Sequence, residues 1–159
     1  MPKKLFVLLA FLVLPLGAHP AAAQSPNDRP DFERDTLQIE TASGRTFDFT
    51  VELATTPRER SYGLMFVEDM PADHGMLFLF DDVAPRSFWM RNTRISLDML
   101  FIDPEGEIIN IAARAVPGDE RSGQYTSDGP AAAVLEINGG LANMIGIAAG
   151  DRVVHGAFE

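Results

Sequence analysis

From Thr36 onward, the sequence consists of short runs in which apolar and polar residues alternate, separated by clusters of turn-forming residues. Alternation with a period of two is typical of β-strands that bury one face. The expected strands cover residues 37–41, 47–53, 76–80, 87–91, 95–101, 107–115, 132–137 and 151–155. About eight short strands joined by turns favour a mainly β fold, a compact β-sandwich or barrel-like single domain with one or two short helices.

Two helices are expected between the strands. Residues 56–59 (Thr-Pro-Arg-Glu) form a capping box with proline in the first turn, and this helix should end near Gly63. A second short helix is expected over 140–145, ended by Gly146. Residues 118–130 are rich in Gly, Ser, Asp and Pro and predict a long surface loop.

The N-terminus has the three parts of a secretory signal peptide. Residues 1–23 combine Lys3 and Lys4, a short apolar run and a closing stretch of alanines. The sequence therefore predicts a signal peptide over 1–23, a flexible lead-in over 24–35 and one β-rich domain over 36–159. We expect the mature protein to be periplasmic or secreted.

Charge and cysteine content exclude several classes of function. The formal net charge is −10, and removal of the two lysines with the signal makes it more negative. An acidic chain is poorly suited to nucleic acid or anionic lipid, which require a basic face. The chain has no cysteine, which excludes disulfides, thiolate nucleophiles and cysteine-ligated metals. No cofactor is expected, and no nucleophile or phosphate-loop motif is present.

Three residues stand out as candidates for a binding site. Trp89 is the only tryptophan; if its neighbours Phe88 and Met90 face the core, alternation turns the indole outward, where it could stack on a ligand ring. The alternative is that Trp89 is buried and covers a second layer of the core. Asp98 and Glu136 are carboxylates inside apolar runs, where they are costly unless paired or used. Arg60 or Arg91 could pair with them, and a purely structural ion pair stays open.

The mature chain also holds six methionines. Thioethers bind copper(I), so a site built from Met65, Met76 and Met90 is possible in an exported protein. Their spacing forms no tight cluster, and gap-filling in the core is the favoured interpretation.

Six motifs occur in a fixed order along residues 37–155. They are Thr56-Pro57-x-Glu59-Arg60, Gly63-Leu64-Met65, Gly75-Met76-Leu77-Phe78, Phe88-Trp89-Met90-x-Asn92-Thr93, Leu97-Asp98-x-x-Phe101-x-Asp103 and Leu135-Glu136-x-x-x-Gly139. In this respect the chain resembles the prokaryotic family called domain of unknown function 192. The resemblance implies a single β-rich domain, often exported, with no established activity. It nominates the motif residues Arg60, Trp89, Asn92, Asp98 and Glu136.

These observations lead to one main hypothesis and three alternatives. The main one is a non-enzymatic periplasmic binding or accessory domain for a small molecule or a peptide segment of an envelope protein. Its patch would use Trp89 for stacking, Asn92 for hydrogen bonding, and Arg60, Asp98 and Glu136 as polar anchors. The alternatives are a glycan hydrolase with Asp98 and Glu136 as acid and base, a methionine-based copper protein, and a structural partner in an envelope complex.

Overall fold

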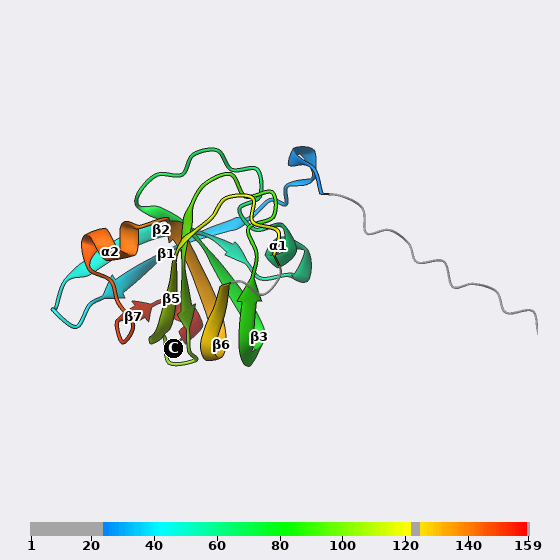
Figure 1. The fold of residues 1–159 in the computed structure, drawn as a ribbon. Helices are drawn as coiled ribbons and strands as arrows, with labels where there is room; N and C mark the ends of the chain where they lie inside the picture. Colours follow the sequence, from blue (N-terminus) through cyan, green and yellow to red (C-terminus); the bar gives the residue numbers. More distant parts are fainter. Residues whose placement is uncertain (1–23, 122–124, 159) are drawn as a thin grey trace, which may run out of the picture.

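The structure is a computed structural model that describes residues 24–121 and 125–158. The expected signal peptide over 1–23 lies outside the described residues. One curled sheet of seven strands forms a half-barrel with two short α-helices, which confirms the mainly β, barrel-like expectation (Figure 1). The strands are β1 (Glu33–Glu40), β2 (Thr46–Ala54), β3 (His74–Phe88), β4 (Leu97–Ile102), β5 (Ile108–Ala115), β6 (Tyr125–Asn138) and β7 (Arg152–Val154).

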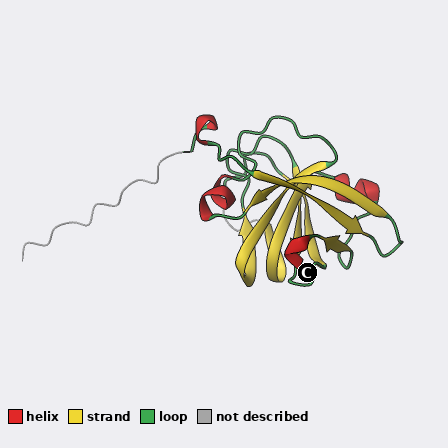
Figure 2. Cartoon of the chain, turned by 180° about the vertical axis from the view of Figure 1, so that it is seen from behind, coloured by secondary structure: helices red, strands yellow, loops and turns green. Residues whose placement is uncertain are grey.

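The sheet has the order β5-β4-β6-β3-β2-β1-β7. Every pairing is antiparallel except that of β2 with β3. The two edges approach each other at one end, where Glu107 forms an isolated bridge with Arg152 and the Ile108 amide donates to the Asp151 carbonyl at 2.9 Å. The sheet is therefore strongly curled, as Figure 2 shows from behind.

Alternation along the strands divides the core into two clusters. One draws apolar side chains from all seven strands, among them Leu77, Leu100 and Leu135, and fills the inside of the curl. The other lies on the outer face and includes Met76 and Met99. Segments around residues 62–67 and 88–95 cover this outer cluster. Each strand in the middle of the sheet is thus buried on both faces, and every residue of β4 is buried.

Both helices form where the sequence predicts them. In α1 (Pro57–Tyr62), the Glu59 amide donates to Thr56 Oγ1 at 3.2 Å and the Thr56 amide donates to Glu59 Oε2 at 2.8 Å, which completes the capping box. Helix α2 (Leu141–Ile145) ends at Gly146, whose φ of 80° favours glycine. The two helices lie at opposite sides of the sheet (Figure 1). Short 3₁₀ turns cover Pro26–Asp28 and Gly156–Phe158.

Three expectations about the elements are wrong in their boundaries. The two strands expected over 76–80 and 87–91 are one long strand, β3, which is bulged between Leu79 and Ala84 and again before Ser87. Its partner β6 begins at Tyr125, so the loop expected over 118–130 is much shorter. The outer halves of β3 and β6 pair with each other beyond the core, where polar residues and proline are tolerated.

The lead-in also differs from expectation. Strand β1 begins at Glu33, so residues 33–35 belong to the sheet. Residues before it contact the domain: the Tyr62 hydroxyl donates to the Ser25 carbonyl at 3.1 Å, and Arg29 pairs with Glu52 at 2.6 Å. In the described part of the chain, no helix is both long and apolar enough to cross a membrane.

Candidate functional site

A small cavity lies between α1, the end of β3 and the middle of β6. Its volume is about 40 Å³, room for one or two water-sized groups. Arg60 and Tyr62 come from α1, Phe88 ends β3, Trp89 follows it, and Glu136 projects from β6. The structure thus brings together three of the five residues singled out from the sequence: Arg60, Trp89 and Glu136.

Glu136 is the unusual group of this cavity. The register pairs it with Met76 on one side and Met99 on the other, so its side chain lies in the outer apolar cluster. The residue is 4% exposed. Between described residues, no hydrogen bond or ion pair involves the Glu136 carboxyl, although Arg60 lines the same cavity.

Burial therefore sets the protonation of this carboxyl. Desolvation penalises the charged form and raises the pKa of Glu136 from 4.5 to about 8. At neutral pH, Glu136 carries its proton and presents a hydroxyl donor and a carbonyl acceptor to the cavity. A buried, uncharged acid in a cavity is a feature of binding and catalytic sites.

A wider groove of about 400 Å³ continues from the cavity. Arg60, Ser61, Phe88 and Trp89 line both hollows, so the two are adjacent. The groove thus lies beside the cavity that Glu136 lines.

Two arginines form one wall of this groove by packing on Phe80. The guanidinium of Arg86 lies 3.8 Å from the ring centroid and that of Arg60 lies 5.2 Å from it. Arg60 also donates to the carbonyls of Thr55 and Leu79, and Arg86 donates to the Ala131 carbonyl at 3.0 Å. These contacts hold both cations in fixed positions.

Trp89 is the exposed aromatic group at the mouth. It is 41% exposed, although Phe88 and Met90 on either side are half-buried and buried. The guanidinium of Arg91 lies 5.5 Å from the indole centroid. The outward orientation expected from the sequence is therefore present, and the indole is accessible to a ligand.

Asn92 does not line the cavity but contacts Met65, which does. Its φ of 56° is in the left-handed region, which Asn adopts more readily than most residues. Its carbonyl accepts from the Phe66 amide at 2.9 Å and its Nδ2 lies 3.7 Å from the Met65 sulfur. Asn92 thus fixes the segment that carries Trp89 against the one that follows α1.

Asp98 is not part of this cavity. It pairs with Ile137 in the β4–β6 register, one position from Glu136, so the two carboxyls project from opposite faces of the sheet. Asp98 is fully buried and accepts from the amides of Arg114 at 2.7 Å, Gly140 at 2.8 Å and Ala142 at 3.0 Å. Its role is to cap the start of α2, and the expected pairing of Asp98 with Glu136 across a cleft is wrong.

The methionines named for copper binding pack in the core. Met65, Met76 and Met90 are each at most 3% exposed and belong to the outer apolar cluster. The surface sulfur cluster that a copper-handling site requires is therefore not formed by these three residues. Within the described ranges 24–121 and 125–158, no three His, Asp or Glu residues come close enough to hold a metal ion.

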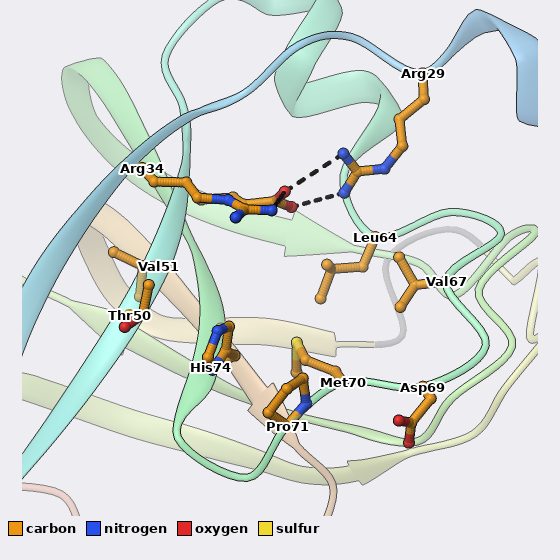
Figure 3. Close-up of a pocket in the computed structure, with 12 residues that line it drawn as sticks. Arg29, Arg34, Thr50, Val51, Leu64, Val67, Asp69, Met70, Pro71 and His74 are labelled. Atoms are coloured by element: carbon orange, nitrogen blue, oxygen red, sulfur yellow. Dashed lines mark hydrogen bonds and ion pairs between the residues drawn. The ribbon is translucent and has the colours of Figure 1, made fainter.

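A further cavity was not anticipated from the sequence. It has a volume of about 290 Å³ and lies between β2, the residues that lead into β1, and the segment between α1 and β3 (Figure 3). Arg29, Arg34 and Glu52 line one side of it. These residues are far apart in the sequence and carry no motif, so only the fold reveals the cavity.

The chain is thus a single, mainly β domain with a small cavity beside Glu136. The model of the family domain of unknown function 192, described as Uncharacterized ACR, matches residues 38–155, and the chain belongs to this family. None of the curated proteins matches the sequence.

Two crystal structures are similar over most of the chain. One, from Sinorhizobium meliloti 1021 and described as a "putative transcription regulator", is 43% identical with a TM-score of 0.77, over 80% of this chain and 98% of that one. The other, a protein of unknown function from Novosphingobium aromaticivorans DSM 12444, is 41% identical with a TM-score of 0.75, over 86% of this chain and 94% of that one.

Proposed function

We propose that this chain is an exported, non-enzymatic binding domain for an uncharged polar ligand, and that the cavity of Arg60, Trp89 and Glu136 is its site. The observation that carries the proposal is the Glu136 carboxyl, which is nearly buried, faces a cavity and has no recorded partner among the described residues. A group of this kind destabilises the folded protein above pH 4.5, which is the ordinary pKa of the side chain. A ligand that accepts a hydrogen bond from the protonated carboxyl would offset this cost.

The charge state of the site disfavours a cationic head group. Glu136 is protonated at neutral pH, and the cations of Arg60 and Arg91 line the same cavity. An ammonium group would be repelled by the arginines and would meet an uncharged acid. A hydroxyl or an amide fits the volume of about 40 Å³ and forms hydrogen bonds with a protonated carboxyl.

The adjoining groove suits the rest of such a ligand. Trp89 offers an exposed ring for stacking, and Arg60 and Arg86 can donate to hydroxyl or carbonyl oxygens. A sugar ring is the first ligand class we propose, with a short peptide segment of an envelope partner as the second. Both classes carry neutral donors and acceptors beside a face that can stack.

Other functions receive less support. Among the described residues that line the cavity, Glu136 supplies the one carboxyl group, so a two-carboxylate hydrolase lacks its second acid. One structurally similar protein is described as a "putative transcription regulator". We do not propose nucleic acid as a ligand of this chain, because its net charge of −10 disfavours contact with a phosphate backbone. Export is proposed from the signal-like residues 1–23.

The proposal is tested by thermal-shift screening of the chain from Gln24 at pH 6. The panel contains neutral sugars, cell-wall fragments, short peptides, amino acids and a polyamine. A ligand at 100 times its dissociation constant adds about 2.7 kcal/mol to the unfolding free energy, which raises the melting temperature by several degrees. We expect a neutral sugar or peptide to give this shift and the polyamine to give none.

Variants then locate the site. If the protonated Glu136 carboxyl donates a hydrogen bond to the ligand, affinity falls about tenfold per pH unit above pH 8. A Glu136→Gln variant keeps a neutral donor and should bind equally at pH 6 and above pH 8. Glu136→Leu and Trp89→Ala should lose binding under both conditions. Arg152→Gln, which changes an exposed arginine on β7, is the matched control. Binding that survives both Glu136→Leu and Trp89→Ala in folded proteins would refute the proposed site.

A further inference from the structure

The cavity of about 290 Å³ in Figure 3 has one charged side and one apolar side. It is separated from the Glu136 cavity by Leu64, a buried residue that lines both. Its volume is within reach of a small organic molecule, since ligand pockets begin at about 300 Å³. It therefore constitutes a second possible site, independent of the proposed function.

The charged side holds two cations for one anion. The guanidinium of Arg29 binds both carboxylate oxygens of Glu52, at 2.6 and 3.4 Å, and Arg34 lies 3.7 Å from the same carboxylate. Glu52 is thus fully engaged by Arg29, while the Arg34 side chain is 70% exposed and has this long contact as its recorded ion pair. On this side of the cavity the charge is one positive unit in excess, and Asp69 on the other side supplies a second carboxylate.

The opposite side is hydrophobic. Leu64, Val67 and Met70, from the segment that links α1 to β3, face the cavity across from the arginines (Figure 3). Val51 of β2 adds to this apolar lining, and Leu64 and Val51 are buried. The acidic residue of this segment, Asp69, is exposed and lies on the other side of the cavity from Arg34 in Figure 3.

We infer that this second cavity binds a small monocarboxylate with an apolar body. The ligand carboxylate pairs with Arg34. It shares with Glu52 the guanidinium groups of Arg29 and Arg34 on this side of the cavity. The hydrocarbon part displaces water from Leu64, Val67 and Met70, and burial of this apolar surface favours binding. An anion without an apolar body, such as phosphate, uses only half of this cavity.

The inference is tested by titrating the ¹⁵N-labelled protein from Gln24 with 4-methylpentanoate and following backbone amide shifts by NMR. Saturable shifts are expected at the amides of Val51, Leu64 and Gly75, which line the cavity. Affinity should rise roughly fourfold per added methylene from acetate upward. The uncharged analogue 4-methylpentanamide should bind at least about tenfold more weakly, because it loses the charge-assisted pair.

Two variants with opposite expected effects sharpen the test. Arg34→Gln removes the exposed cation and should weaken 4-methylpentanoate binding by roughly tenfold. Glu52→Gln removes the competing carboxylate and should tighten binding. Arg152→Gln is the matched control for the loss of an arginine. Glu136→Gln should leave the affinity for 4-methylpentanoate unchanged. A failure of this inference is therefore distinguishable from a failure of the proposed function.

Several results would overturn the inference. They are equal affinity for the acid and its amide, unsaturable shifts, or shifts that map outside the cavity. A folded Glu52→Gln variant that binds no more tightly than the wild type would also overturn it, because the excess of positive charge would then play no part.

Discussion

Replacing Glu136 with glutamine should stabilise the protein at neutral pH and leave it unchanged in acid. Glutamine has nearly the same shape and cannot ionise. The comparison therefore isolates the cost of the ionisable group in a site where the residue is 4% exposed. The sign of this stability change follows from whether the Glu136 carboxyl holds its proton in the folded protein and in the unfolded chain.

The magnitude follows from the pKa of Glu136, which burial raises from 4.5 to about 8. Between these pH values the folded protein keeps a proton that the unfolded chain releases, so stability is greatest below pH 4.5 and falls as pH rises to about 8. A tenfold change in proton affinity corresponds to about 1.4 kcal/mol. The wild type therefore loses about 3 kcal/mol by pH 7 and about 5 kcal/mol above pH 8, both order-of-magnitude figures.

Urea denaturation at pH 4, 7 and 9 measures the effect. The Glu136→Gln variant should match the wild type at pH 4 and exceed it by about 3 kcal/mol at pH 7 and about 5 kcal/mol at pH 9. Glu105→Gln, which changes an exposed glutamate in a turn, is the control and should follow the wild type throughout. A difference between Glu136→Gln and wild type that does not vary with pH would refute the reasoning, since the carboxyl would then be solvated.

Three further substitutions test the framework around the site by equilibrium unfolding. Asp98→Asn places an amide donor against three backbone amides and should destabilise the fold by at least about 3 kcal/mol; a neutral effect would contradict the capping role. Thr56→Ala removes the side-chain cap of α1 and should cost about 1 kcal/mol, and an unchanged midpoint would count against the capping box. Gly75→Ala puts a methyl group 2.6 Å from the Glu136 carbonyl oxygen and should cost about 2 kcal/mol, while Gly156→Ala, which meets no atom within 4 Å, should be neutral within about 0.5 kcal/mol.

The sequence predicts most of the fold because alternation and capping are local properties. The hairpin of β1 and β2, the start of α1 at Pro57 and the end of α2 at Gly146 each follow from neighbouring residues. The outer half of β3 was missed because Asp81, Asp82 and Pro85 look like a turn. These residues are exposed, and the strand is held there by pairing with β6, which the local sequence does not encode.

The candidate site was predicted in part for the same reason. Burial inside an apolar strand marks Glu136 and Asp98 equally, but the register between β4 and β6 decides which face each one occupies. That register depends on the whole sheet, so Asp98 was expected beside Glu136 and instead caps α2. The cavity of Arg29, Arg34 and Glu52 gives no signal in the sequence, because its lining is drawn from segments that meet only in the folded chain.

The most direct test of the account is the titration of the Glu136 carboxyl itself, followed by ¹³C NMR with Glu136→Gln to assign the resonance. We expect a pKa of about 8, and a further rise when a neutral ligand from the screen accepts a hydrogen bond from the protonated carboxyl. A pKa near 4.5, with or without ligand, would show an ordinary ionised carboxylate and would contradict the claim that this cavity is built around an uncharged acid.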